Sequence, residues 1–493
     1  MTETGSTANI SHRTRPVRSA LFAAPIFCLL FTSISAGQNG SNTQGASQPQ
    51  QAAQPPANPT QEIASEQPAG PAIEVGPARL RIGGYLGVTG IYRSTNIGGG
   101  AGTSFASIPY EDTAQGNVSE TRLSAQSSRI SIRVDAEFPE PDTRFRKLSG
   151  YFEMDFNGTT PGTVAVTSTS VGLRLRQGFA EAQYGATWFL AAGQAFTLMT
   201  AQKDQLSIWP SDVEMSQAID TNYLAGMVWS RTPQVRVTWR PSSRISWAMS
   251  VENPEQQLGR GLVTLPRCCA SDIDAQYNTG GDELKVPNLM PDIVSRVAFN
   301  PVKPLHVDVG GVFRVFRHTI APYDDDFKAV GGGANINARV NVTSSTKLLA
   351  QSAFGSGLGR YIGGLAPDVA FRRDGSISTI GTMSWVGGVE QTLSPRLSLG
   401  GYYSGVNTDD SFDLDSDGGY IGYGYPGSSN SDNRSVQEVT GTGSYQFLKS
   451  TDRGSGQFNL QLSWLRRQPS SQGSGLASAN AVMFFAQVRY NLP

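Results

Sequence analysis

The sequence predicts an all-β protein, a transmembrane antiparallel β-barrel of about 16 strands that follows a disordered N-terminal segment. Apolar and polar residues alternate with a period of two along most of the chain after Pro77, the pattern of a strand with two different faces. The connections between these stretches are alternately short and long, as in outer-membrane barrels. Hydrophobic residues make up only 38 % of the 493 residues, which is low for a large soluble core.

The N-terminus carries the features of an exported protein. Residues 1–37 are expected to form a secretory signal peptide, with three arginines before a short apolar run (Ala20 to Ile34) and small residues for cleavage. The run is too short to be a membrane-spanning helix. Residues 38–76 are rich in Gln, Pro, Ala and Ser and predict a disordered tether. Residues 77–493 are left for the barrel.

The alternating stretches define the strands. In one of them Ile130, Ile132 and Val134 alternate with polar residues, and the same pattern continues to the C-terminus. Strand starts are expected near residues 79, 122, 148, 172, 188, 224, 244, 293, 304, 329, 345, 377, 396, 434, 455 and 481. Pro233 falls inside the stretch 224–240, which we interpret as one long strand kinked at its proline. Splitting this stretch would raise the strand number towards 18.

Arginines in the alternating stretches indicate a polar lumen. A lipid-facing Arg near the bilayer midplane costs about 2–4 kcal/mol in a barrel, so these side chains should point inward. Guanidinium groups bind carboxylates, and a ring of them favours anions. The alternative is that the arginines pair with wall carboxylates and only stiffen the barrel. The candidate pore-lining residues are Arg129, Arg133, Arg174, Arg176, Arg236, Arg244, Arg296, Arg314, Glu153 and Asp155.

The third long connection, Phe196–Tyr223, is a candidate constriction loop. Barrels of this size often narrow the lumen with a loop that folds inward, and the mixed charges and aromatic residues of this segment suit that position. The alternative is an ordinary surface loop. The candidate constriction residues are Lys203, Asp204, Trp209, Asp212 and Glu214.

The segment from Arg122 to Gln256 resembles the DcaP-like family of trimeric outer-membrane porins. The matching stretches, in order, are Arg122–Arg129, Gly150–Gly158, Leu173–Phe179, Ala192–Gln194, Arg231–Arg236 and Val251–Pro254. The resemblance implies a homotrimer and a preference for dicarboxylates and other anionic solutes. Two features depart from the family pattern. The Gln- and Pro-rich tether replaces a coiled-coil segment, and the chain ends in Tyr490-Asn-Leu-Pro493 instead of a terminal Phe.

Other motifs give weaker signals. Cys268 and Cys269 are adjacent and could form a vicinal disulfide in an oxidising compartment or stay as free thiols. The segment Asp413–Asp417 matches the start of a calcium loop but has Gly424 where the bidentate Glu is needed, so a solvated acidic loop is the simpler interpretation. The net charge of −1 argues against a nucleic-acid partner. No cofactor, metal or enzymatic activity is expected.

These observations favour a porin in the outer membrane of a Gram-negative bacterium, a water-filled channel for passive diffusion of small anionic solutes. The expected surroundings are outer-membrane lipid and lipopolysaccharide. The alternative is a plugged receptor or adhesin barrel that binds a partner through its long loops.

Overall fold

The computed structural model describes residues 72–97, 100–138, 144–158, 172–259, 261–277, 279, 286–323, 325–428, 432–450, 452–470 and 479–493. The predicted signal peptide and most of the predicted tether lie outside these ranges. No helix of the described ranges is long and apolar enough to cross a membrane.

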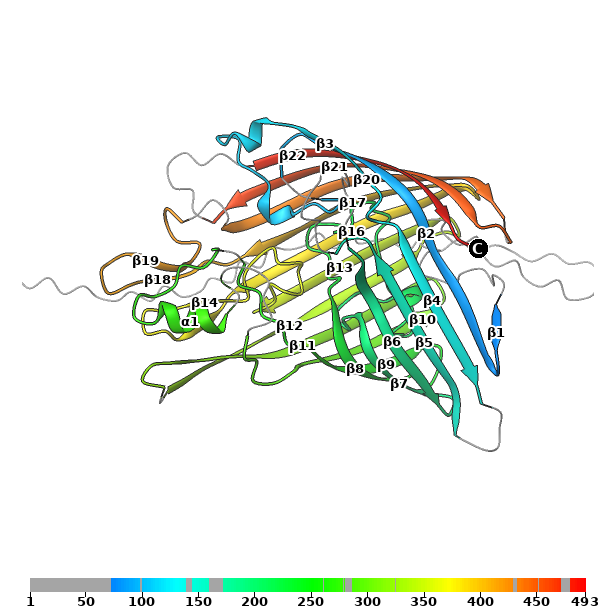
Figure 1. Ribbon diagram of the computed structural model, residues 1–493, viewed down its shortest axis with the longest axis horizontal. Coiled ribbons are helices and arrows are strands. Elements are labelled where there is room, and N and C mark those ends of the chain that lie inside the picture. Colours follow the sequence, from blue (N-terminus) through cyan, green and yellow to red (C-terminus); the bar gives the residue numbers. More distant parts are fainter. Residues whose placement is uncertain are drawn as a thin grey trace, which may run out of the picture. The chain divides into compact units, whose positions relative to one another are not determined.

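The described strands form a closed antiparallel barrel of sixteen positions, as predicted (Figure 1). β2 closes it by pairing with β22 from Tyr85↔Asn491 to Arg93↔Met483. β3 and β4 pair with opposite halves of β2 and together form one barrel position. The barrel strands are β2 (Ala78–Arg93), β3 (Glu120–Ser124), β4 (Arg129–Glu137), β5 (Phe145–Asp155), β6 (Arg174–Tyr184), β7 (Trp188–Phe196), β8 (Arg231–Trp239), β9 (Ile245–Glu252), β10 (Asp292–Val302), β11 (Leu305–Ile320), β12 (Asp325–Asn341), β13 (Thr346–Ser356), β16 (Gly381–Ser394), β17 (Leu397–Thr408), β20 (Asn433–Lys449), β21 (Ser455–Pro469) and β22 (Ala479–Asn491).

The two faces of each strand differ as the alternation requires. On β21 the side chains of Leu460, Leu462 and Trp464 are exposed on the outside, whereas Gln461 and Ser463 are buried inside. The outer surface is therefore apolar, and the inner surface carries the polar groups. A closed sheet pairs its backbone hydrogen-bonding groups between strands, and its apolar outer side chains face lipid. This barrel therefore has the architecture of a Gram-negative outer-membrane protein.

Pro233 is not a kink in a long strand. β8 begins at Arg231, and residues 224–230 belong to the preceding loop, so the predicted strand over 224–240 is wrong in its first seven residues. Pro233 pairs with Gln194 at the start of the strand, on the exposed face. A proline cannot donate to a ladder and is tolerated near a strand end, which explains both its position and the sixteen-strand count.

The barrel wall is uneven in height. β4 to β9 have only 8 to 11 residues each, enough to cross a bilayer at the usual tilt. β11, β12 and β20 have 16 or 17 residues and continue beyond that height on the long-loop side (Figure 1). The short strands β4 to β9 are called the low wall here. Above the low wall, on the long-loop side, the lumen is therefore bounded by loops.

The remaining elements lie outside the barrel positions. Cys268 and Cys269, one residue before α1, are joined in a vicinal disulfide, one of the two states considered from the sequence. The other elements are β1 (Ile73–Val75), α1 (Ala270–Gln276), β14 (Val369–Phe371), β15 (Ile377–Thr379), β18 (Ser411–Leu414), β19 (Tyr420–Tyr423) and three 3-10 turns, Phe105–Ser107, Gln115–Asn117 and Pro210–Asp212.

Candidate functional site

The connection between β7 and β8, residues 197–230, folds into the barrel and is called the inner loop here. The backbone N–H groups of Ile219 and Asp220 donate to Gln461 Oε1 on β21, at 2.5 and 3.0 Å. The N–H of Ala225 donates to Glu438 Oε2 on β20 at 2.8 Å. The loop therefore crosses the lumen from the low wall to the opposite wall, and it is not a surface loop.

The charged residues of the inner loop hold its shape. Asp212 is buried and accepts hydrogen bonds from the backbone N–H groups of Asp204, Gln205 and Ser207, and burial raises the pKa of its carboxyl. Lys203 Nζ donates to the carbonyl of Ser211 at 3.0 Å. These contacts are internal to the loop. The main role of Lys203 and Asp212 is therefore to hold the shape of the loop and not to contact solute.

Glu214 anchors the inner loop to β12 and β13. Its carboxylate pairs with Lys347 Nζ of β13 at 2.9 Å and with Arg339 Nη1 of β12 at 3.5 Å. Burial opposes ionisation, but the cations of Lys347, Arg339 and Lys203 outweigh it and lower the pKa of Glu214 to about 2. The carboxylate is therefore ionised at neutral pH and its charge is compensated.

Trp209 fastens the loop to the low wall. Its indole Nε1 donates to Glu181 of β6 at 2.6 Å. The ring packs edge-on against Tyr151 and Phe179, and the guanidinium of Arg133 lies 4.2 Å from the ring centroid. Two of the predicted constriction residues, Glu214 and Trp209, thus anchor the loop to two sides of the lumen.

Two arginines of β6 share the carboxylates of β5. Arg174 Nη2 and Arg176 Nη1 each lie 2.8 Å from Asp155 Oδ2, and Arg176 Nε lies 2.6 Å from Glu153 Oε1. The antiparallel pairing of β5 with β6 places Arg174 directly opposite Asp155. A bulge between Glu153 and Met154 turns Arg176 towards both acids.

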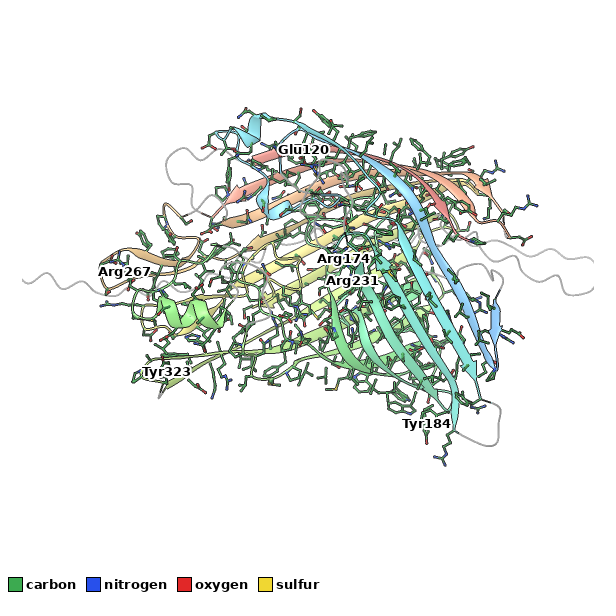
Figure 2. The ribbon with its side chains drawn as sticks, in the orientation of Figure 1. Glu120, Arg174, Tyr184, Arg231, Arg267 and Tyr323 are labelled. Carbon is green, nitrogen blue, oxygen red and sulfur yellow. A yellow bond between two sulfur atoms is a disulfide. The ribbon has the colours of Figure 1, made fainter. Side chains whose placement is uncertain are left out.

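Arg129 and Arg231 add two guanidiniums without a matching acid. Arg129 of β4 stacks on Tyr85, and Arg231 stacks on Phe196 and Trp229, at 5.4–5.6 Å. Within the described part of the chain, Arg129 Nε and Arg231 Nη1 are buried and have no hydrogen-bond partner. Arg174 and Arg231 lie near the upper ends of β6 and β8 (Figure 2). Four arginines thus surround two carboxylates, Glu153 and Asp155, and this guanidinium cluster carries a net charge of about +2.

The positive charge continues towards the short-turn side. Arg81, Arg133 and Lys147 all pair with the single carboxylate of Asp135, at 2.8–3.0 Å. Arg489 of β22 also lies over the ring of Tyr85, 5.1 Å from its centroid, and donates to the amide oxygen of Gln457. Together with the guanidinium cluster, these groups form one basic wall over β2, β4, β5, β6 and β22.

Tyr223 links the inner loop to this basic wall. Arg176 Nη2 donates to its phenol oxygen at 3.3 Å. The residue has a φ of 63°, a left-handed conformation that costs energy for a side chain of this size. Burial opposes ionisation of the phenol, but the positive charges of Arg176, Arg129 and Arg231 outweigh it and lower the pKa of Tyr223 to about 8.

Four of the predicted pore-lining arginines do not face open lumen. Arg236 and Arg296 point inward but are covered by the inner loop, where Arg236 donates to the carbonyl of Ser207 and Arg296 to that of Met199. Arg314 is likewise buried under loops. Arg244 is not in a strand: it lies in the exposed turn between β8 and β9, so strand parity does not apply to it. The prediction failed for Arg236, Arg296 and Arg314 because the alternation shows on which face of the strand a side chain lies. It does not show which loops pack against that face.

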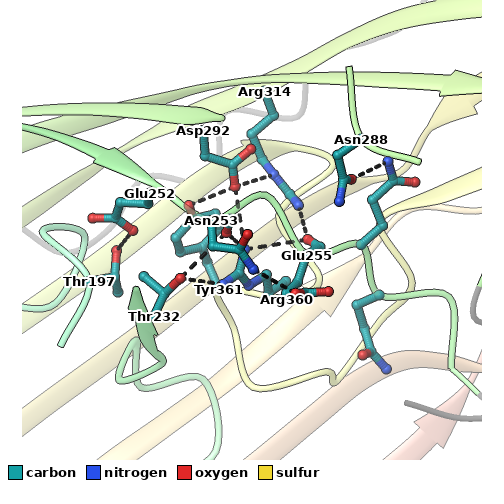
Figure 3. Close-up of polar contacts among 12 residues, drawn as sticks. Thr197, Thr232, Glu252, Asn253, Glu255, Asn288, Asp292, Arg314, Arg360 and Tyr361 are labelled. Atoms are coloured by element: carbon teal, nitrogen blue, oxygen red, sulfur yellow. Dashed lines mark hydrogen bonds and ion pairs between the residues drawn. The ribbon is translucent and has the colours of Figure 1, made fainter. Parts of the chain in front are cut away.

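Arg314 belongs to a buried ion cluster that holds the loop after β13 in place (Figure 3). It pairs with Asp292 at 3.1 Å and with Asp368 at 2.7 Å. Arg360 reaches Thr232 Oγ1 at 2.9 Å, and Tyr361 donates to Asp292 at 2.9 Å. Two cations and two carboxylates balance, so this cluster fixes the loop without adding net charge to the lumen.

Two cavities flank the inner loop. The smaller, about 110 Å³, lies beside the basic wall and is lined by Arg129, Arg176 and Arg489, with Lys203 and Tyr223 from the loop. The larger, about 480 Å³, lies on the long-loop side. Arg231 was missed as a site residue because the strand was expected to start at residue 224. Pro233 was the available signal, since a proline two residues after a basic residue also fits a strand start. Tyr223 ended the predicted constriction loop but was not among its candidate residues.

The acidic segment Asp413–Asp417 is engaged by Arg267. Asp415 accepts a hydrogen bond from the backbone N–H of Arg267, and Asp417 pairs with the Arg267 side chain at 2.8 Å. Among the described residues, no three His, Cys, Asp or Glu side chains are grouped in a way that could hold a metal ion.

The barrel is similar to solved outer-membrane channels. It aligns with the outer membrane channel DcaP of Acinetobacter baumannii at a TM-score of 0.61 and 16 % identity, over 84 % of this chain and 97 % of that chain. This is the fold of an outer-membrane channel. The resemblance drawn from the sequence is therefore confirmed as a likeness of fold. The anion-selective porin from Comamonas acidovorans aligns at a TM-score of 0.49 and 11 % identity, over 84 % and 100 % of the two chains. The sequence matches no family model and no curated protein.

Proposed function

We propose that this barrel is a porin, a water-filled channel for passive diffusion of small solutes that prefers anions and carboxylates in particular. One observation carries the proposal: the guanidinium cluster lies beside the inner loop, where four arginines surround two carboxylates. Arg129 of that cluster lines the smaller cavity and has no partner acid among the described residues.

A basic wall in a narrow lumen has a predictable effect on ions. Low-dielectric surroundings focus the field, so anions concentrate at the wall and cations are repelled. The planar guanidinium fork also matches the geometry of a carboxylate, which favours organic acids over simple halides. Added salt should weaken the preference by screening.

Three of the four acids of the inner loop are compensated or buried, whereas Asp204 is exposed and accepts a hydrogen bond from Asn300. Glu214 is paired with two cations, and Asp212 is enclosed by its own loop. Asp220 is buried, and burial raises the pKa of its carboxyl, which favours the uncharged form.

We propose outer-membrane lipid and lipopolysaccharide as the surroundings of the apolar belt, and a homotrimer as the assembly. The low wall of β4 to β9 supports the trimer, since a short, apolar-faced stretch of barrel is the place where neighbouring copies could approach.

The test is the reversal potential of the purified protein in a planar bilayer across a KCl gradient. The wild type should show anion preference, and the Arg129→Ala/Arg174→Ala variant should lose most of it. Arg244→Ala is the matched control, because Arg244 lies in an exposed turn and its loss should change nothing. Cation preference in the wild type would refute the proposed selectivity. An anion preference unchanged in the double variant would remove these two arginines from the mechanism.

A plugged receptor or adhesin is the second candidate, and a specific observation favours it. On the long-loop side, Phe105, Ile108 and Ile362 are packed inside the barrel in one apolar cluster with inward residues such as Leu465 and Phe485. Such packing narrows the mouth. Single-channel recording separates the two functions, because a porin gives stepwise open currents and a plugged barrel gives none.

A further inference from the structure

The larger cavity is a candidate binding site of its own. It has a volume of about 480 Å³, within the usual range for small-molecule sites. It lies at the upper ends of β6 to β8, where the low wall stops, and five parts of the chain line it. They are residues 103–106, Arg174 and Leu175, Gln194, Asn222 to Arg231, and Ile362 to Leu365.

One side of the cavity is basic but offers only one uncompensated charge. Both Arg174 and Arg231 line it. Arg174 is engaged by Asp155 through two hydrogen bonds, at 3.1 and 2.8 Å. Arg231 has no carboxylate partner among the described residues, and its Nη1 is buried without any hydrogen-bond partner. Arg231 lines the cavity without a carboxylate partner in the described part of the chain, and a guanidinium in that position favours an anionic oxygen.

Much of the remaining lining is apolar, although Thr103, Ser104, Gln194, Asn222 and Ser230 also contribute to it. Phe105, Leu224, Met227, Ile362 and Leu365 are each 5 % exposed or less and line the space with the ring of Trp229. These side chains offer nothing to a hydrated inorganic ion. They would bury the hydrocarbon part of a ligand, which is the main source of affinity in such sites.

The site is also held in place before any ligand arrives. Trp229 and Phe196 flank the Arg231 guanidinium. Asn222 Nδ2 donates to the Thr103 carbonyl at 2.9 Å and links the connection between β2 and β3 to the inner loop. The ion cluster of Arg314 with Asp368 fixes the loop that carries Ile362 and Leu365. Fixed walls lower the ordering cost of binding.

We infer that this cavity binds an organic monoanion with an apolar body, such as an aromatic monocarboxylate, with the carboxylate on Arg231 and the body against Leu224, Met227 and Ile362. The inference deepens the proposed porin function by naming a class of solute that the channel captures at its mouth. A dianion is disfavoured, because its second charge would be placed against the apolar side.

Calorimetric titration of the detergent-solubilised full chain tests the site independently of conduction. The probes are benzoate, acetate (the same charge without the ring), benzyl alcohol (the ring without the charge) and phthalate (the ring with two charges). Benzoate should bind at least ten-fold more tightly than each of the other three. Arg231→Gln should weaken benzoate binding at least ten-fold, and the matched Arg244→Gln variant should leave it unchanged.

A second variant guards against misfolding of the first. Met227→Ser should weaken benzoate binding several-fold and leave the weaker acetate binding unaffected, because it alters only the apolar side. Equal binding of acetate and benzoate, tighter binding of phthalate, or benzoate affinity unchanged in Arg231→Gln would each overturn the inference. Failure of the porin function is recognised separately: benzoate binding without single-channel currents supports the site in a closed barrel, whereas currents without benzoate binding overturn the site alone.

Discussion

The phenol oxygen of Tyr223 lies 3.3 Å from Nη2 of Arg176, so an ionisable side chain of the inner loop touches the basic wall. Tyr223 holds a left-handed backbone conformation to make this contact. Strain of this kind persists only where the surrounding structure enforces it. The position of the loop and the charge of the wall are therefore coupled at one residue.

The first prediction is a loss of anion preference at alkaline pH. Because the pKa of Tyr223 is lowered to about 8, the phenol is neutral at pH 6.5 and largely ionised at pH 9. The phenolate adds a negative charge beside Arg176, so the anion-to-cation permeability ratio should fall by about two-fold over this range. Reversal potentials at the two pH values measure the change. Tyr223→Phe should remove it, and an equal fall in that variant would assign the titration to another group.

The second prediction has the opposite sign. Asp135→Asn removes the only carboxylate shared by Arg81, Arg133 and Lys147, so the wall becomes more positive and anion preference should increase. The change should also destabilise the barrel by about 1–2 kcal/mol, less than for a fully buried pair because the three cations are about one-third exposed. Reversal potential and urea unfolding give the two values. A decrease in anion preference would show that Asp135 lies outside the ion path.

The third prediction concerns the anchor at Glu214. Glu214→Gln removes the ion pairs with Lys347 and Arg339, so the inner loop should loosen and brief current fluctuations should become more frequent. In the wild type the pKa of Glu214 is lowered to about 2. Its stabilising contribution is complete above the pKa of an unfolded Glu, about 4.3, and is lost as the pH falls from there towards 2. Wild-type recordings should therefore show few current fluctuations down to about pH 4. More frequent fluctuations above that pH would contradict this role of Glu214.

The fourth prediction isolates a close backbone approach. Gly226 has a φ of +80°, and a Cβ there would lie 2.1 Å from the carbonyl oxygen of Gly405 on β17. Gly226→Ala should displace the inner loop and change the single-channel conductance, at a cost of about 1–3 kcal/mol. Gly185→Ala is the matched control, because Gly185 also has a positive φ but has open space at its Cβ. Equal effects of the two substitutions would attribute the cost to the dihedral angle and not to the contact.

The barrel could be predicted from the sequence because lipid imposes a simple rule on every strand. Leu460 and Leu462 had to face outward and Gln461 inward, and the structure places them so. The stretch 224–240 was misread because a Val- and Trp-containing run beside a proline satisfies the same rule whether it is a strand or the end of a loop. The distinction is made by contacts, such as that of Ala225 with Glu438, which no local pattern contains.

The candidate site was predictable only in part for the same reason. Arg129, Arg174 and Arg176 lie together because the antiparallel register of β4, β5 and β6 brings them there. Arg296 and Arg236 obey the same parity but are covered by the inner loop. Which arginine stays accessible depends on the path of a 34-residue segment, 197–230, and that path is fixed by partners far away in the chain.

The distant anchors of the inner loop impose an order on assembly. Gln217, Ile219 and Ala225 are held by Tyr402, Gln461 and Glu438, which follow them by 185 to 242 residues. A chain delivered only as far as β9 contains the whole loop and none of these three anchors. The loop therefore lacks these three anchors until the C-terminal strands are inserted. Barrel closure and the final placement of the inner loop across the lumen are coupled, because both depend on β17, β20 and β21.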